Sequence, residues 1–421
     1  MAVEATQLPL PAQYRAMLRV LEGIVKHRRA SPTTASDLHY YELMLEYFQR
    51  LGRAREEGKT IAGFGIILPN EILYAMDIVP LHLELGSSAL VAILNAYEEA
   101  FSRSKAFGLP PEMCSAHRAL AAVHLLRWVP SPDVVVWSNT ICSSCAKSGE
   151  LVARLWDVPG FYLDRPYRWG PQDIHYFTRE LEEMVSFLED RTGKKLSWDR
   201  LQETLEHSAR MVRLEQEIRK LRMQVPSPAL NRYINQFVVI DWLYGGTPQG
   251  EAFARTVRDE MVSRLAQGNS QERLRLVSLF PPPLYRWKLV DWMQKERGVS
   301  LVADPFCFHW VDWEPDPSRP LESLAWKCFL EPHCRTMHGP VEWAVEAAVT
   351  DAVESRAQGA IYWAAAGCPQ GCGMVRPLRD ALREQAGLTT LVVDMEVNDP
   401  SFVPLEVLQE KLDSFFETLE G

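Results

Sequence analysis

Short apolar segments alternate with segments of helical periodicity along two stretches of this 421-residue chain. Apolar segments lie at 61–67, 78–85, 132–140 and 160–167 in the first stretch, and at 273–280, 299–304, 359–366 and 388–396 in the second. Between them lie segments with helical spacing, among them 69–77, 147–156, 341–357 and 374–387. Alternation of this kind is typical of α/β proteins with parallel sheets, because parallel strands need a crossover connection. The pattern predicts two α/β domains of similar layout.

Two other regions have long helical periodicity. In 12–58 we expect Ser36 to cap a helix, and in 171–267 we expect Gly193 to end one helix and Ser197 to cap the next. The stretch between 304 and 341, rich in Trp and Pro, is predicted to be irregular. We therefore predict four regions: an N-terminal helical lead-in over 1–59, a first α/β domain over 60–170, a helical insertion over 171–270 and a second α/β domain over 271–421.

Charge and hydropathy exclude two classes of partner. The chain has 45 basic and 55 acidic residues, a net charge of −10, and no block of Lys and Arg that would follow a phosphate backbone, so we expect no nucleic acid. The most apolar stretch is broken by Pro69, Asn70, Glu71 and Asp77, and the N-terminal residues lack the pattern of a signal peptide. We expect a cytoplasmic protein without a membrane segment.

The cysteines follow the predicted strands. Cys142 and Cys145 come directly after the apolar run ending at 138, and Cys368 and Cys372 come directly after the run ending at 366. In open α/β sheets, ligands bind outside the carboxyl ends of the strands, and a following helix N-terminus favours thiolate over thiol. We therefore expect the two loops to face one another across a cleft.

Eight cysteines are too few for a disulfide scaffold in a chain of this length, so the loop thiols are candidate metal ligands or catalysts. Cys328, in an apolar helical context, is predicted to be a small core residue. The glycines around Cys368 and Cys372 suggest a backbone that wraps closely around a bound group. Zinc is one alternative, although zinc ribbons usually space their cysteine pairs by ~15 to 20 residues. A thioredoxin-type redox pair is another. An iron–sulfur cluster held by distant thiolates is the chemical interpretation that we favour.

Several segments resemble the superfamily of benzoyl-CoA reductases and 2-hydroxyacyl-CoA dehydratases. The segment ILPNEILYAMDIVPLHL is similar to its first α/β signature, and PEMCSAHRAL and VVVWSNTICSSCAKSGELVARLWDVPGFYLDRP are similar to its first two cysteine segments. ERGVSLVADPFC resembles an acidic strand end of the family, and QGAIYWAAAGCPQGCGMVRPLRDALREQAGLTTLVVDMEVND resembles its third cysteine segment. The resemblance extends from about residue 60 to 415.

The resemblance implies a specific fold and chemistry. It implies two flavodoxin-like parallel-sheet domains and a helical domain, with a 4Fe-4S cluster in the cleft held by Cys114, Cys142 and Cys368. It also implies one-electron chemistry on an acyl-CoA thioester, either dehydration of a 2-hydroxyacyl-CoA or reduction of an aromatic or unsaturated one. The electrons would come from a separate ATP-dependent iron–sulfur activator. The chain has no G-x-x-x-x-G-K-[ST] motif, which agrees with ATP hydrolysis by a partner.

Extra cysteines leave alternatives open. Cys145, Cys307 and Cys372 join the three implied ligands to give six candidates, which is similar to a branch of the superfamily with a double-cubane 8Fe-9S cluster. That branch acts as a homodimer on small non-CoA molecules, whereas other members form heterodimers with a related subunit. A third hypothesis is a non-catalytic subunit that carries a cluster or zinc. His309 is the candidate catalytic proton donor, with His333 and His338 nearby, and Lys147, Arg165 and Arg376 are candidates for contacting CoA.

Overall fold

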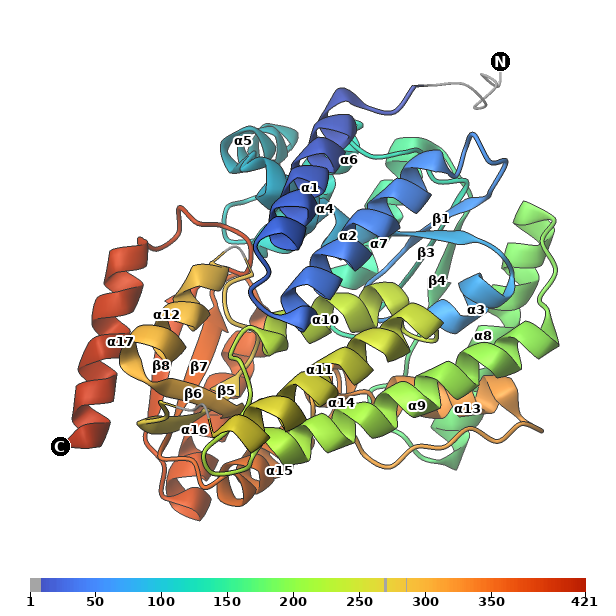
Figure 1. Cartoon of the computed structure of the whole chain (residues 1–421). Coiled ribbons are helices and arrows are strands. Elements are labelled where there is room, and N and C mark those ends of the chain that lie inside the picture. Colours follow the sequence, from blue (N-terminus) through green and yellow to red (C-terminus); the bar gives the residue numbers. More distant parts are fainter. Residues whose placement is uncertain (1–8, 269–270, 285) are drawn as a thin grey trace.

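The computed structural model describes residues 9–268, 271–284 and 286–421. Positions 1–8 of the predicted lead-in, 269–270 of the predicted helical insertion and Tyr285 of the predicted second α/β domain lie outside the described residues. Two four-stranded parallel sheets organise the chain (Figure 1). The first contains β1 (Ile61–Phe64), β2 (Val79–His82), β3 (Val134–Ser138) and β4 (Gly160–Leu163), and the second contains β5 (Leu274–Leu279), β6 (Val299–Ala303), β7 (Gly359–Ala365) and β8 (Thr390–Met395).

The two sheets have the same topology. Their strand orders are β2-β1-β3-β4 and β6-β5-β7-β8, with every neighbouring pair parallel. This is the 2-1-3-4 order of flavodoxin-like sheets, in which the ligand crevice opens where the order reverses, between the first and third strands. The strands β1, β5, β6 and β7 are buried along their whole length, as expected for parallel strands covered on both faces. The prediction of two α/β units of this class is confirmed.

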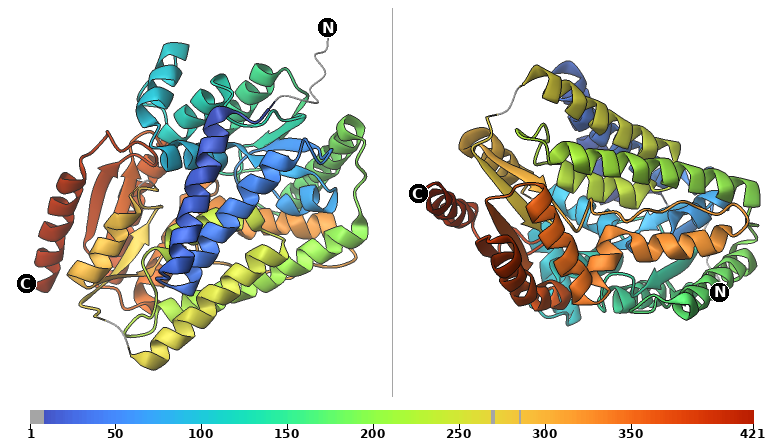
Figure 2. Two further views of the ribbon diagram at one scale, coloured as in Figure 1. Left: turned by 45° about the horizontal axis from the view of Figure 1, so that its top comes forward. Right: turned by 90° about the horizontal axis from the view of Figure 1, so that it is seen from below.

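Helices cover both sheets. Those of the first half are α3 (Asn70–Ala75), α4 (Leu83–Leu94), α5 (Tyr97–Phe107), α6 (Ser115–Leu125) and α7 (Cys145–Trp156). Those of the second half are α12 (Trp287–Arg297), α13 (Pro320–Leu330), α14 (Pro332–Met337), α15 (Val341–Glu354), α16 (Pro369–Ala386) and α17 (Leu405–Glu420). Figure 2 shows α17 at the outer edge of the second sheet. Within the described residues, no helix combines the length and hydrophobicity that a membrane crossing requires.

Two further groups of helices complete the fold. The N-terminal α1 (Ala12–Ala30) and α2 (Ala35–Arg53) pack side by side, and α1 contacts α4 (Figure 2). The middle of the chain forms α8 (Pro171–Thr192), α9 (Trp198–Arg222), α10 (Tyr233–Tyr244) and α11 (Pro248–Gln267). Helix α13 packs against α8, and its Lys327 forms a 2.6 Å ion pair with the buried Glu71 of α3. The boundaries of the four predicted regions stay a prediction.

Local expectations were correct in part. Gly193 ends α8 in the left-handed conformation and Ser197 caps α9 by accepting from the Arg200 amide, both as predicted. The expected cap at Ser36 is wrong, because Thr34 lies one residue before the helix and accepts from the Asp37 amide. The stretch expected to be irregular contains α13 and α14, each opened by a proline in its first turn, where the missing amide hydrogen carries no penalty.

The second cysteine loop differs from the expectation. Helix α16 begins at Pro369, five residues earlier than its apolar pattern suggested, because Cys368 caps it and accepts from the Gly371 amide at 3.3 Å. Gly371 and Gly373 therefore lie inside a helix. Gly367, which precedes the helix, serves a close approach, since a Cβ there would lie 2.6 Å from the Cys114 amide nitrogen.

Candidate metal centre

The carboxyl ends of both sheets open onto one cavity of about 110 Å³, which we call the thiol cavity. Residues that follow six of the strands line it: Ile66, Cys142, Phe280, Phe306, Cys368 and Val397. Cys142 and Cys368 follow the third strands of their sheets, and Ile66 and Phe280 follow the first strands. The cavity thus occupies the reversal point of both sheets at once, which is where α/β folds bind ligands. The expectation that the two loops face one another is confirmed.

Four of the six candidate cysteines line the thiol cavity: Cys114, Cys142, Cys145 and Cys368. Three of them lie at helix N-termini, since Cys114 caps α6, Cys145 is the first residue of α7 and Cys368 caps α16. Amide hydrogens and the helix dipole stabilise a thiolate at such positions. The chain therefore gathers sulfur donors from both sheets in a setting that favours their metal-binding form.

A carboxylate connects the two halves beside the cysteines. Glu396, which follows β8, accepts hydrogen bonds from the amides of Ser115 and Gly367, the residues next to Cys114 and Cys368. Arg118 of α6 adds a 3.0 Å ion pair to Asp399, and both side chains are about nine-tenths buried. These contacts hold the start of α6 against the loop after β7, so that Cys114 and Cys368 lie on the same wall of the thiol cavity.

The tightest group of donors is formed by Cys142, Cys145 and His117. The Cys142 and Cys145 sulfurs are 3.3 Å apart, and His117 Nε2 lies 3.8 Å from each. These three side chains are a candidate metal-binding group. The His117 side chain is buried, and among the described residues its Nδ1 has no hydrogen-bond partner.

The charges of this group are coupled. The hydrogen bond from Cys145 holds the pKa of Cys142 well below that of an ordinary thiol, against the effect of burial and with help from His117. The same hydrogen bond, together with burial, raises the pKa of Cys145. Burial works against the charged form of His117, yet the bond to Cys142 and the nearby Glu84 raise its pKa. These interactions lower the pKa of Cys142 and raise the pKa of Cys145, so the thiolate of this pair is favoured at Cys142.

The remaining walls of the thiol cavity are mostly apolar. Val238 and Trp242 of α10 and Met337 of α14 join the two phenylalanines named above. His333 reaches the cavity from α14, held by a 2.9 Å bond between its Nδ1 and Glu331. A dry, apolar surround strengthens the electrostatic interactions of any bound group.

The other predicted site residues lie elsewhere. Cys307 is buried behind the cavity, 3.6 Å from His333 Nε2, and the exposed Cys372 turns back to donate to the Ala365 carbonyl. His309 is not among the lining residues of the thiol cavity, and its Nδ1 pairs with Asp351 at 2.7 Å. Its predicted catalytic role stays a prediction.

The candidates for contacting CoA do not converge either. Arg165 is buried, donates to the His338 carbonyl and lies over the Phe329 ring. Arg376 is exposed and pairs within its own helix with Asp380, and Lys147 is also exposed.

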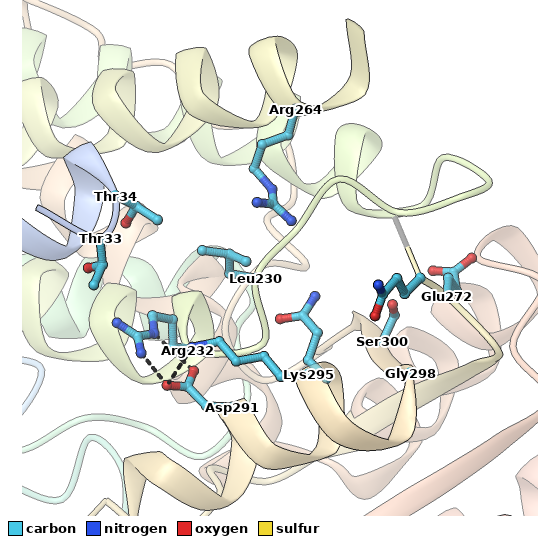
Figure 3. A pocket seen from close by; sticks show the side chains of 12 residues that line it. Thr33, Thr34, Leu230, Arg232, Arg264, Glu272, Asp291, Lys295, Gly298 and Ser300 are labelled. Atoms are coloured by element: carbon cyan, nitrogen blue, oxygen red, sulfur yellow. Dashed lines mark hydrogen bonds and ion pairs between the residues drawn. The ribbon is translucent and has the colours of Figure 1, made fainter. Parts of the chain in front are cut away.

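A larger cavity of about 310 Å³ lies at the opposite ends of β5 and β6, next to the turn between α1 and α2 (Figure 3). Its two arginines already have partners, because Arg232 pairs with Asp291 and Asp37, and Arg264 donates to the Pro228 carbonyl. Among the described residues, none of the candidate cysteines lines it. We therefore place the chemistry at the thiol cavity.

Comparison with known proteins identifies the family of the chain. The family model described as 2-hydroxyglutaryl-CoA dehydratase, D-component, matches residues 66–419, which include every residue named in the thiol cavity. The chain belongs to this family. The match begins after α1 and α2, so the N-terminal helix pair lies outside it.

Individual relatives are distant. The chain is 23% identical over 265 residues to the (R)-phenyllactyl-CoA dehydratase alpha subunit of Clostridium sporogenes, an alignment that covers 59% of this chain and 64% of that protein. It is 22% identical to the (R)-2-hydroxyisocaproyl-CoA dehydratase alpha subunit of Clostridioides difficile, covering 64% and 69% of the two chains. It is also 22% identical to a benzoyl-CoA reductase subunit of Thauera aromatica, covering 69% and 71%. The family resemblance predicted from the cysteine segments is confirmed.

Sequence reasoning missed His117 and Glu84. A signal for His117 was present, because it follows Cys114 by three residues, a spacing that puts both side chains at the start of one helix. Glu84 had no comparable signal, since only the tertiary fold brings α4 to the cysteines.

Proposed function

We propose that this chain is the iron–sulfur subunit of an enzyme that performs one-electron reductive chemistry on an acyl-CoA thioester, by dehydration of a 2-hydroxyacyl-CoA or by reduction of an aromatic or unsaturated one. The observation that supports it is the convergence of Cys114, Cys142, Cys145 and Cys368 on one apolar cavity at the carboxyl ends of both sheets. Membership of the dehydratase family and the names of the relatives supply the substrate class.

The donor set fits an iron–sulfur cluster, because thiolates are the ligands that such clusters take. Cys114, Cys142 and Cys368 would hold the cluster, as the resemblance implies, and it would supply an electron at a potential outside the range of organic side chains. The chain's own residues set the conditions. Helix N-termini stabilise the thiolates, and the apolar walls around Phe280, Phe306 and Trp242 exclude water.

The partners follow from the same proposal. Each of the three relatives named above is one subunit of its enzyme, which supports a multi-subunit enzyme in which this chain pairs with a related subunit. Electrons would come from a separate ATP-dependent activator, in agreement with the missing P-loop motif. A reducing cytoplasm would keep all eight cysteines free, as they are in the structure.

One specific observation favours a second candidate, a site for a single tetrahedral ion such as zinc. Metal–sulfur bonds of about 2.3 Å and metal–nitrogen bonds of about 2.0–2.1 Å place the donors of a tetrahedral ion about 3.5–3.8 Å apart. His117 Nε2 lies 3.8 Å from the sulfur of Cys142 and 3.8 Å from that of Cys145, and the two sulfurs are 3.3 Å apart. In this case the chain would be a structural or non-catalytic subunit.

Anaerobic purification followed by iron, sulfide and zinc analysis separates the candidates. We expect about four irons with matching sulfide and one paramagnetic signal from the reduced protein. About eight irons would indicate the double-cubane type and a small non-CoA substrate. Zinc without sulfide would overturn the redox proposal and favour the single-ion site.

A further inference from the structure

A second apolar cavity adjoins the thiol cavity. It has a volume of about 320 Å³, within the range of small-molecule sites, and lies between the N-terminal helices α1 and α2 and the helices α4 and α12. We call it the helix-pair cavity. Three residues line both cavities: Leu85 and Ser88 of α4, and Leu284 after β5. The two cavities therefore share a wall formed by these three residues.

The walls of the helix-pair cavity suit an uncharged hydrocarbon group. Tyr40 of α2 and Trp287 of α12 form an aromatic wall with ring centroids 5.1 Å apart, and Met44, Ala92 and Ile93 add aliphatic surface. Among the described residues that line it, none is acidic, basic or a histidine. Such a surface gains free energy by burying alkyl or aryl groups and disfavours charged ones.

One polar side chain in this cavity points to a ligand. Asn398 is 1% exposed, and its Nδ2 has no hydrogen-bond partner among the described residues. Its backbone is fixed, because its amide donates to Ser115 Oγ at 2.9 Å. The preceding residue, Val397, lines the thiol cavity. A buried amide donor without an acceptor costs free energy, so a carbonyl oxygen supplied by a ligand would relieve it.

We propose that the helix-pair cavity binds the acyl group of the thioester, with its alkyl or aryl part among α1, α2 and α4 and its carbonyl oxygen accepting from Asn398 Nδ2. This inference rests on the proposed function, which supplies the substrate class. The wall that α1 and α2 contribute lies outside the residues matched by the family model, whereas the wall from α4 and α12 lies inside them.

The test measures binding rather than turnover. Isothermal titration calorimetry on the anaerobically purified protein uses free CoA, acetyl-CoA and hexanoyl-CoA. We expect hexanoyl-CoA to bind about tenfold or more tightly than acetyl-CoA, since each buried methylene adds to the affinity. Ala92→Phe fills the cavity and should remove this preference. Val20→Phe adds the same bulk to α1 at a side chain that is 39% exposed and outside the cavity, and should keep it.

The carbonyl contact has its own variant. Asn398→Ala should lower the affinity for both thioesters by about three- to tenfold and leave the affinity for free CoA unchanged, because only the thioesters carry the acyl carbonyl. Thermal unfolding followed by circular dichroism checks that each variant folds, and Ala89→Phe, one turn earlier in α4, replaces Ala92→Phe if that variant does not.

The outcomes distinguish the two proposals. Equal affinities for acetyl-CoA and hexanoyl-CoA would overturn the assignment of this cavity and leave the proposed function intact. The same holds if Ala92→Phe and Val20→Phe show the same preference for hexanoyl-CoA over acetyl-CoA. Failure of the metal-loaded protein to bind CoA or either thioester would overturn the proposed function and this inference with it.

Discussion

The loops after β3 and β7 occupy equivalent places in two sheets of the same topology, and they use their cysteine pairs differently. In the first loop the helix α7 begins at the second cysteine, Cys145, so a turn lies between the two cysteines. The Cys142 sulfur accepts from the Cys145 amide and lies 3.3 Å from the Cys145 sulfur. In the second loop the helix begins directly after the first cysteine, so Cys372 already lies in the helix, where it is exposed and donates to the Ala365 carbonyl.

This difference shows that the start of the following helix, more than the spacing of the motif, decides which sulfurs reach the cavity. A residue that caps a helix points toward the helix N-terminus, and a residue one turn inside has its direction fixed by the helix. Cys368 is of the first kind and Cys372 of the second. The first loop contributes two sulfurs to the thiol cavity and the second contributes one.

We expect the largest effect on metal content when a sulfur that lines the thiol cavity is removed. We expect Cys142→Ser and Cys368→Ser each to lower the metal content of the anaerobically purified protein about tenfold or more, since even partners outside the ligand shell commonly change metal affinity by about 10–100-fold. Cys372→Ser is the matched control in the second loop and should keep its metal. Metal loss in Cys372→Ser equal to that in Cys368→Ser would contradict the distinction between the two positions.

Thiol reactivity of the metal-free protein should differ between the loops as well. The pKa of Cys142 is lowered by the hydrogen bond from Cys145, whereas burial raises the pKa of Cys368 to about 12 and also raises that of Cys372. At pH 7 the thiolate fraction should therefore be larger at Cys142 than at Cys368 or Cys372. We expect iodoacetamide to modify Cys142 about tenfold or more faster than Cys368, as followed by mass spectrometry of peptides.

The alkylation rates of the two loops should also depend differently on pH. Between pH 8 and pH 6, the rate at Cys372 should fall about tenfold per pH unit, because a thiol with a raised pKa loses its thiolate fraction in proportion to the proton concentration. The rate at Cys142 should change much less, because its pKa lies below the ordinary value. In Cys145→Ala, which removes the donor, the rate at Cys142 should drop and its profile should approach that of Cys372. Parallel profiles in the parent protein would show that Cys142 holds no thiolate.

Local sequence signals predicted the parts of this architecture that local interactions decide. Apolar runs marked the strands, Gly193 and Ser197 marked helix ends, and the cysteine pairs at strand ends predicted facing loops. Helix starts were less predictable where a cysteine acts as the cap, since Cys368 caps α16 although Ser, Thr, Asp and Asn are the usual residues.

The composition of the site depends on contacts that no local pattern reveals. Cys114 reaches the wall of the second sheet because Glu396, 281 residues from Ser115 in sequence, accepts from the Ser115 amide. Cys307 follows a strand in the same way as the other candidates, yet its backbone amide bonds to Asp304 and its sulfur lies beside His333, behind the cavity. From the sequence, Cys114 is an implied ligand and Cys307 a further candidate, and of the two the tertiary fold places only Cys114 in the lining of the thiol cavity.

The helices that follow the two loops extend the comparison to stability. In α7, a Cβ at Gly149 would lie 2.1 Å from the Cβ of Trp137 on β3, an atom that cannot rotate away from the backbone. We expect Gly149→Ala to lower the free energy of unfolding by about 1–3 kcal/mol, measured by chemical denaturation of the metal-free protein, because α7 must move off the sheet. That movement would also shift Cys145 from Cys142 and slow alkylation of Cys142. An unchanged unfolding midpoint would mean that α7 packs less closely on β3 than the structure shows.

We expect the smallest effect from a glycine-to-alanine change in α16, the helix after the second loop. This change should raise the free energy of unfolding, whereas Gly149→Ala in α7 should lower it. A Cβ at Gly373 in α16 meets no atom within 4 Å, so an alanine there adds no strain. Since Ala favours the helix over Gly, we expect Gly373→Ala to raise the free energy of unfolding by about 0.5–1 kcal/mol in the same denaturation measurement. Its metal content should equal that of the parent, because Cys368 keeps its place at the cap. If Gly373→Ala lost metal or stability, the first turn of α16 would have to change shape when metal binds, and the second loop would resemble the first more closely than its contacts indicate.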